Sequence, residues 1–135
     1  MASELMNSEK LSEFAKRYAE AWCSQNPKEV AAFYAKDASI YVNSGPPSSI
    51  IEVAHGFMRD FPDMFVRFDK LEPRGRSIAF HWTLIGTNSG PAGTGNRVRI
   101  SGYELWKIDN NGLIAESKGH FDAVEYQRQL KHGVN

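Results

Sequence analysis

The chain has little of several features that would indicate particular functions. It has one cysteine, Cys23, so an internal disulfide is excluded and a reducing compartment is indicated. Its 16 basic residues balance 16 acidic ones, and without a basic surplus we expect neither nucleic acid nor a membrane surface as partner. We find no signal-peptide pattern and no apolar run long enough to cross a bilayer. These absences favour a cytoplasmic protein whose partner is a small molecule or another protein.

Length and composition indicate one folded unit. The 135 residues are enough for a single core, so we expect one domain, 1–135, without a linker or internal repeat. Hydrophobic residues make up 41% and charged residues 24%, which is ordinary for a globular chain. Aromatic residues, at 12%, are frequent, as they would be around an apolar cavity.

The first half of the sequence shows helical patterns. Apolar residues recur at helical spacing from Leu11 to Trp22, with charged residues between them. Two later starts carry capping signals, Asn26 followed by Pro27, and Ser49 with Glu52 three residues on. The predicted helices are 8–24, a short one from residue 27 that includes Tyr34, and 49–61, with a strand at 39–43 before the third.

The second half alternates as strands do. Strands are predicted at 64–72, 77–88, 97–108 and 113–121, followed by a helix from Asp122. Short turns such as 109–112 make consecutive strands antiparallel neighbours. Helices at the front and strands at the back predict an α+β domain, a cone-shaped curved antiparallel sheet with the N-terminal helices on its concave face. Such a cone provides a mostly apolar pocket.

Glu104 stands in an apolar row. On strand 97–108, one face collects Val98, Ile100, Gly102, Trp106 and Ile108 together with this carboxylate. Burial of an unpaired charge is costly, which leaves two alternatives. Glu104 pairs with a basic neighbour such as Lys107, Arg97 or Lys118, or it lies in the cavity with a raised pKa.

His120 and Asp122 are the candidate catalytic pair. They share one face of strand 113–121 with Lys118, opposite Gly119 and Phe121. In an apolar cavity Asp122 would accept a proton from carbon, and His120 would donate a hydrogen bond to the oxyanion that develops. The alternative is structural, since Asp122 and Glu125 have the spacing of a helix cap and its partner.

The remaining candidates are aromatic or are set aside. Tyr18 and Trp22 lie on the apolar stripe of the first helix, where the Tyr18 hydroxyl would reach the pocket floor, and Trp82 and Trp106 are further lining candidates. The string GPAGTG joins two strands and reads as a hairpin loop instead of a phosphate loop. We predict no metal site and no cofactor.

Several short motifs resemble one known family. They are G-T-x-x-G from Gly86, T-G-x-x-V from Thr94, an acidic turn ending in Gly-Leu-Ile, and D-x-x-x-x-x-x-Q-L from Asp122. With DASI in the first half, this pattern resembles the SnoaL-like polyketide cyclases of the ketosteroid isomerase-like and nuclear transport factor two-like superfamily. The resemblance implies the cystatin-like α+β barrel fold and a cofactor-free aldol cyclisation, in which Asp122 abstracts a proton beside a carbonyl.

The sequence departs from the family pattern at identifiable positions. Asn88 stands where members usually carry His, and a Trp usual near Lys118 is absent. Tyr18 occupies a place like that of the oxyanion-hole Tyr of ketosteroid isomerases, while Val42 lies near the position of their catalytic carboxylate. Steroid isomerase activity is therefore not expected.

Three hypotheses follow for function. The first is a cofactor-independent enzyme that acts by acid/base chemistry on a small apolar carbonyl compound. The second is a domain that binds an apolar ligand without transforming it, and the third is an association domain with a filled pocket. In each case we expect a homodimer, because the outer sheet face carries Tyr103 and Leu105 beside Arg97 and Arg99.

Overall fold

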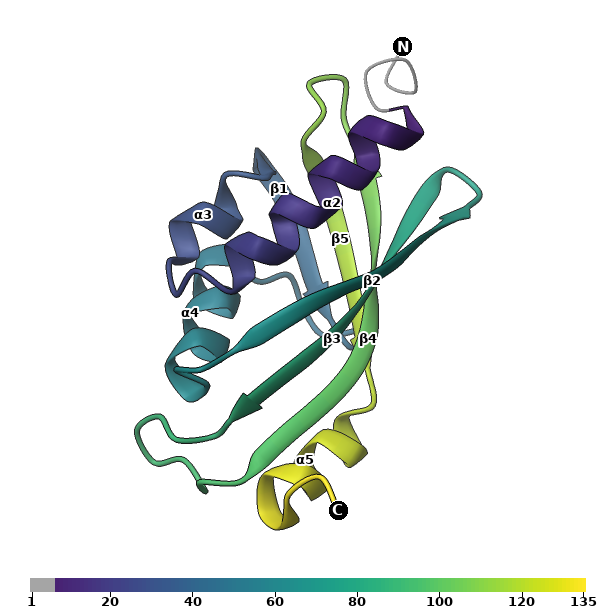
Figure 1. Ribbon diagram of the computed structural model, residues 1–135. Helices are drawn as coiled ribbons and strands as arrows, with labels where there is room; N and C mark the ends of the chain where they lie inside the picture. The colour runs from purple at the N-terminus through teal and green to yellow at the C-terminus, as the bar shows by residue number, and fades with distance from the viewer. Residues whose placement is uncertain (1–6) are drawn as a thin grey trace.

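The computed structural model describes residues 7–135 as a strongly curved sheet with helices against its inner face (Figure 1). The five strands lie in the order β1-β5-β4-β3-β2. The elements are α2 (Ser8–Trp22), α3 (Pro27–Ala31), β1 (Tyr34–Val42), α4 (Ile50–Asp60), β2 (Phe65–Arg74), β3 (Ser77–Thr87), β4 (Arg97–Ile108), β5 (Ile114–Phe121) and α5 (Ala123–His132). The predicted α+β class is confirmed.

Most predicted elements occur, with two differences. The caps at Asn26 and Ser49 form as predicted, and α2 begins at Ser8 as predicted, with Asn7 as its cap, but it ends at Trp22 instead of residue 24. Tyr34, predicted in a helix, begins β1, and this strand pairs in parallel with β5. The sheet is thus mixed. After β1, helix α4 carries the chain to β2 at the opposite edge of the sheet, and the following strands return to β5 beside β1. Parallel strands need such a long connection, whereas antiparallel neighbours need only a turn.

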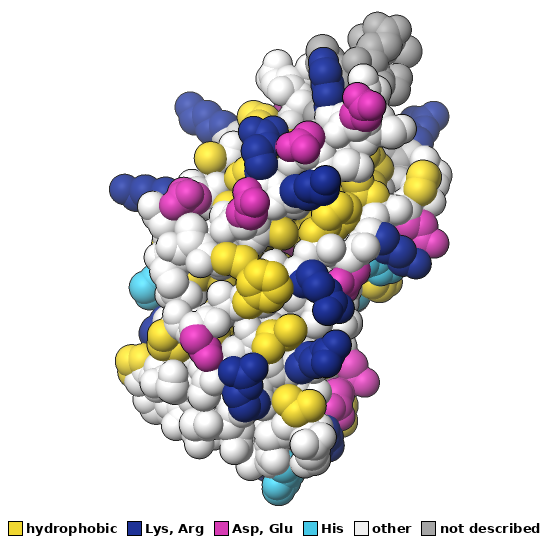
Figure 2. All heavy atoms as spheres, viewed as in Figure 1, with side chains coloured by type: hydrophobic (Ala, Val, Ile, Leu, Met, Phe, Trp, Pro, Cys, Tyr) yellow, Lys and Arg dark blue, Asp and Glu magenta, His cyan; other side chains and the backbone are white. Residues whose placement is uncertain are grey.

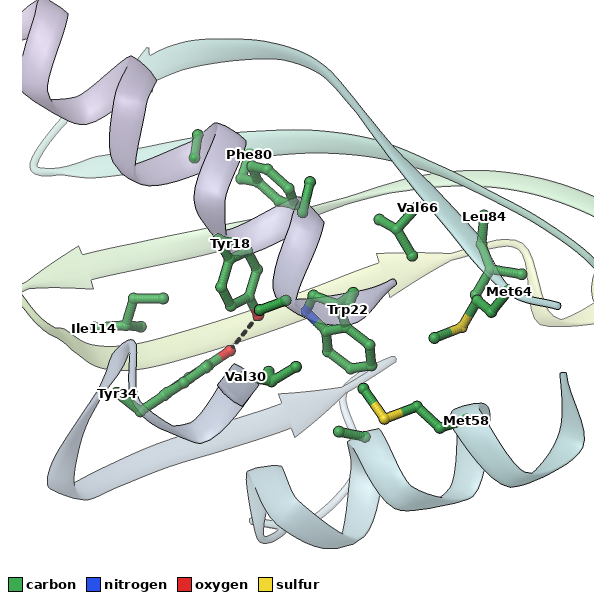
Figure 3. Close-up of a cluster of buried hydrophobic side chains, with 14 of the residues drawn as sticks. Tyr18, Trp22, Val30, Tyr34, Met58, Met64, Val66, Phe80, Leu84 and Ile114 are labelled. Carbon is green, nitrogen blue, oxygen red and sulfur yellow. Dashed lines mark hydrogen bonds between the residues drawn. The ribbon is translucent and has the colours of Figure 1, made fainter. Parts of the chain in front are cut away.

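The core fills the concave side of the sheet. Helix α2 crosses this face, and α3 and α4 stand together at one side of it (Figure 1). Tyr18 on α2 meets Trp106 on β4 edge to face at 5.1 Å, and Trp106 stacks on Phe80 at 4.8 Å. Figure 3 shows the side chains of this cluster converging from α2, α4 and the strands. The packing of aromatic rings therefore holds α2 on the sheet.

The outside of the helical layer is polar. Figure 2 shows basic and acidic side chains interspersed on this side, with hydrophobic side chains between them. No helix within residues 7–135 is long and apolar enough to cross a membrane.

Helix α5 packs beside the first residues of β4, which extend beyond the end of β5. Gln129 is buried, and its Oε1 accepts a hydrogen bond from the backbone N–H of Arg99 at 2.7 Å. The side chain of Asn96 donates to the carbonyl of Leu130 at 2.8 Å. These contacts satisfy the backbone N–H of Arg99 on β4 and the carbonyl of Leu130 on α5, and they tie α5 to the start of β4.

The sheet depends on a glycine opposite Trp82. A Cβ at Gly102 would lie 2.4 Å from the His120 carbonyl oxygen and 2.7 Å from Cζ2 of Trp82. We expect Gly102→Ala to lower the free energy of unfolding by about 1–3 kcal/mol, because the backbone of β5 or the indole must shift. Urea denaturation measures this.

Gly56 provides the matched control. It lies inside α4, and a Cβ there would meet no atom within 4 Å. Gly56→Ala should raise the free energy of unfolding by roughly 0.5–1 kcal/mol, because alanine favours the helix. Equal effects of the two substitutions would contradict the close approach at Gly102.

Candidate functional site

A small cavity lies between the helices and the open half of the concave face. Its volume is about 70 Å³. This is less than half of the ~150 Å³ of a cavity that holds benzene. The walls are largely apolar and come from α2, β1, α4 and the other strands. The lining residues are Trp22, Tyr34, Ile40, Tyr41, Val42, Ile50, Val53, Phe57, Val66, Phe80, Trp82, Leu84, Glu104, Ser117, Gly119 and Phe121.

Glu104 is the carboxylate of this cavity, and one of its oxygens is heavily hydrogen-bonded. Oε1 accepts from the Trp106 indole at 2.8 Å, the Tyr18 hydroxyl at 2.9 Å, and the Ser117 hydroxyl at 3.1 Å. The Tyr34 hydroxyl lies 3.4 Å from the same oxygen and 2.7 Å from that of Tyr18, a bond drawn in Figure 3. The donors come from four elements, α2, β1, β4 and β5, which fixes the carboxyl group in position.

The second oxygen, Oε2, is left for the cavity. No donor from residues 7–135 bonds to it, and it is not among the buried polar atoms that lack a partner. Glu104 lies inside the protein, but its side chain is only half-buried. The exposed part of its surface borders the cavity. Gly119, paired with Glu104 across the strands, adds no side chain beside it. A proton on Glu104 would therefore sit on Oε2.

Burial and hydrogen bonding act on Glu104 in opposite directions. Burial raises the pKa of the carboxyl group above its ordinary 4.5, while the bonds from Trp106, Tyr18, Ser117 and Tyr34 lower it. Burial is the larger effect, so the pKa is raised. Burial, and then the charge of Glu104, also raise the pKa of Tyr18 and Tyr34 well above 10.0. Both tyrosines therefore remain hydrogen-bond donors.

Two buried donors at the cavity wall have no acceptor. The indole N–H groups of Trp22 and Trp82 are covered and make no hydrogen bond within the described part of the chain. An unpaired buried donor costs about 1–3 kcal/mol. Both N–H groups are covered, so neither faces the space of the cavity.

The structure brings five of the predicted site residues together. Trp22, Trp82 and Glu104 line the cavity, and Tyr18 and Trp106 lie behind it, bonded to Glu104. The alternative in which Glu104 pairs with a basic residue is wrong, because its partners are Trp106, Tyr18, Ser117 and Tyr34. Lys107 and Lys118 lie near Glu116, at 3.6 and 3.9 Å, and Arg97 lies near Asp63 at 3.6 Å.

The expected position of Asp122 and His120 in the cavity is wrong. Asp122 is exposed, and its Oδ1 accepts the backbone N–H of Glu125 at 3.0 Å as the cap of α5. The register pairs Glu104 with Gly119 and Tyr103 with His120. Because paired residues of antiparallel strands share a face, His120 and Lys118 lie on the convex side, away from Glu104. The cap alternative for Asp122 is confirmed.

His120 belongs to a row of rings on the convex face. Its ring lies 5.1 Å from that of Tyr103, which lies 5.6 Å from that of His81. His81 bonds to Glu72 at 3.0 Å, and Arg74 covers the Tyr103 ring at 4.9 Å. The homodimer through this face stays a prediction.

Several lining residues were not singled out from the sequence. Tyr34 was placed in a helix, and Ser117 was assigned to the face opposite the candidate pair. Phe57 and Phe121 line the cavity as well. The signal for Ser117 was present, because it shares parity with Gly119 and Phe121, and all three face Glu104 once the register is known.

Comparison with known proteins places this geometry in a family. Residues 12–130 match the family model of SnoaL-like polyketide cyclases. The chain belongs to this family. No curated protein matches the sequence. The matched residues include all five strands and every residue that lines the cavity.

Solved structures show the same fold. AclR of Streptomyces galilaeus, a proposed hydroxylase, is 16% identical, with TM-score 0.78 over 92% of this chain and 86% of that one. IdmH of Streptomyces antibioticus, a proposed polyketide cyclase, is 21% identical, with TM-score 0.71 over 88% and 96%. A ketosteroid isomerase-like protein of Catenulispora acidiphila in complex with trimethylamine is 15% identical, with TM-score 0.74 over 87% and 91%.

Asn88, which replaces the usual histidine of the SnoaL-like pattern, has a structural role. It is buried, its Oδ1 accepts from the Thr94 backbone N–H at 2.8 Å, and its Nδ2 donates to the Asp60 carbonyl at 3.2 Å. It does not line the cavity. Asn88 thus ties the 88–96 loop to the end of α4. Among residues 7–135, no group of three or more His, Cys, Asp or Glu side chains could hold a metal ion.

The raised pKa of Glu104 predicts a pH dependence of stability. The folded state holds the proton more tightly than the unfolded state, so the stabilisation is complete below the ordinary 4.5 and is lost as pH rises through the folded pKa. Glu104→Gln keeps a neutral side chain and lacks this dependence. The wild-type free energy of unfolding minus that of the variant should therefore fall as pH rises above the ordinary 4.5 and through the raised pKa. Urea denaturation of both proteins measures the difference, and a value that rises with pH would contradict the raised pKa.

Proposed function

We propose that the cavity is the active site of a cofactor-independent enzyme that acts by acid/base chemistry on a small apolar carbonyl compound. Glu104 is the proton-transferring group in this proposal. The observation that carries it is the asymmetry of the carboxyl group, with all four donors on Oε1 and Oε2 left towards the cavity. Membership of the SnoaL-like family supports this class of chemistry.

The proposed step is enolisation. Ionised Glu104 takes a proton from the carbon beside the carbonyl, the C–H electron pair forms the enolate, and the proton is held on Oε2 until it returns to carbon. A raised pKa strengthens the carboxylate as a base. The volume of about 70 Å³ favours a compound of few atoms.

Binding without chemistry is the second candidate. The small cavity and its apolar walls suit ligand retention, and the Catenulispora acidiphila protein shows this fold holding a small molecule. A ligand that saturates the cavity with no proton exchange would favour this function.

Deuterium exchange tests the enzyme. In D₂O, the protein should accelerate exchange of the hydrogens beside the carbonyl of acetone, a ketone of four heavy atoms, and NMR follows this exchange. Glu104→Gln should lower this rate by about 10²–10⁴-fold, because Oε1 still accepts hydrogen bonds while the base is gone. Circular dichroism checks the fold of the variant.

Asp122→Asn is the matched control. Asp122 is the other acidic candidate and lies outside the cavity, so its amide variant should retain the wild-type exchange rate within about twofold. Loss of exchange in Asp122→Asn with full activity in Glu104→Gln would return the catalytic role to Asp122.

A further inference from the structure

The hydroxyl hydrogens at the cavity are already in use. The Ser117 hydroxyl donates to Glu104 Oε1 at 3.1 Å, and the Tyr18 hydroxyl donates to the same atom at 2.9 Å. A phenol has one hydrogen atom to donate, so Tyr34 is the donor in its 2.7 Å bond to Tyr18 (Figure 3). Neither Ser117 nor Tyr34, the two hydroxyl residues beside Glu104 in the lining, therefore has a hydrogen atom left for a ligand.

The other side-chain donors of the lining residues do not reach the space of the cavity. The indole N–H groups of Trp22 and Trp82 are covered. Tyr41 pairs with Lys118 in the register of β1 and β5, so its side chain lies on the convex side of the sheet. No Lys, Arg or His of residues 7–135 is among the lining residues. The walls thus offer a ligand apolar surface and acceptor atoms, but no free side-chain donor.

Oε2 of Glu104 is the acceptor that most needs a partner. It accepts no hydrogen bond from residues 7–135, and it borders the cavity beside Gly119, which adds no side chain. A buried charged oxygen without a donor is costly. One acceptor suits a ligand with one donor. An ammonium ion carries several N–H groups, and those that Oε2 did not accept would stay unpaired among apolar walls, whereas an alcohol carries a single O–H.

We infer that the cavity binds small aliphatic alcohols, with the hydroxyl group donating to Oε2 of Glu104 and the alkyl group against the apolar walls. The volume of about 70 Å³ limits the ligand to very short alcohols such as methanol and ethanol. The inference concerns binding and needs no reaction, so it stands apart from the proposed enzyme. An alcohol in this position should compete with a ketone for the same space.

Ethanol and acetonitrile form a matched pair of probes. Both have three heavy atoms and mix with water, but only ethanol has a hydroxyl donor. Above the pKa of Glu104, the wild-type protein should bind ethanol at least ~10-fold more tightly than acetonitrile, because a carboxylate accepts from the hydroxyl group alone. NMR titration measures both affinities, about millimolar or weaker for ligands of this size, through the amide signals of Ser117 and Gly119. The amide of Gly56 on α4, outside the lining, reports general solvent effects.

Glu104→Gln should change the two affinities in opposite directions. The partners of Oε1 are all donors, from Trp106, Tyr18, Ser117 and Tyr34. The amide oxygen of the new side chain therefore takes the place of Oε1, and its NH₂ group faces the cavity. Ethanol then loses its acceptor while the nitrile nitrogen gains a donor. The acetonitrile affinity should rise by roughly 2–10-fold and the ethanol affinity should fall, so that the preference is lost.

The wild-type protein gives the same contrast without a substitution. Below its raised pKa, Glu104 carries a proton on Oε2, and this atom becomes a donor. Tyr18 and Tyr34 are the other titratable groups that face Glu104, and both stay neutral because their pKa values are well above 10.0. As pH is lowered through the pKa of Glu104, the acetonitrile affinity should therefore rise and the preference for ethanol should shrink.

Gly119→Ala tests the space beside Oε2. A Cβ there would lie 3.7 Å from the Tyr41 carbonyl oxygen and 3.8 Å from Cγ of Glu104, which is ordinary contact, so the backbone need not shift. The added methyl group takes part of the cavity and should weaken both probes about 10-fold. Gly56→Ala, outside the lining and with no atom within 4 Å of the new Cβ, should change neither affinity.

Three results would overturn the inference: no binding of ethanol, equal affinity for the two probes in the wild type, or a preference for ethanol that survives in Glu104→Gln. None of them depends on acetone exchange. Exchange of acetone hydrogens without a preference for ethanol would leave the proposed enzyme alone, and a preference for ethanol without exchange would leave this inference alone.

Discussion

The hydrogen bonds to Oε1 of Glu104 are the interaction on which the arrangement of this molecule depends. Donors from α2, β1, β4 and β5 meet at this one atom. A hydrogen bond to a charged group contributes about 1.5–3 kcal/mol, and leaving such an acceptor buried and unpaired costs more. The helix that covers the sheet and the parallel edge strand are therefore held in register by the group that faces the cavity.

Glu104 also marks the boundary between two halves of the concave face. On one side, Tyr18 and Trp106 pack edge to face at 5.1 Å and are not among the residues that line the cavity. On the other, the sheet widens towards Trp82 and Phe121, and Gly119 adds no side chain. Because the carboxyl group is fixed from the packed side, it presents its free oxygen to the hollow side without the mobility of a glutamate on a surface. Such preorganisation is what proton transfer and ligand binding both require.

The sequence predicted the architecture better than the site. Strong alternation predicted β4 at 97–108 with the observed bounds, and capping signals located α4 because they depend on neighbours in sequence. The direction of β1 depends on which edge of the sheet α4 reaches, and local pattern does not contain that information. The same limit explains Asp122. Parity grouped His120 with Lys118 correctly, but only the pairing of Glu104 with Gly119 decides which face is inside.

Glu104 shows the other side of this limit. The sequence shows that Glu104 stands among apolar residues of one strand, which makes burial the expected cause of a raised pKa. The partners of its Oε1 atom come from residues 18, 34, 106 and 117, which only the fold brings together. Those partners oppose the effect of burial on the pKa. Because the hydrogen bonds that hold the group in place are all made by Oε1, Oε2 borders the cavity with no donor from residues 7–135.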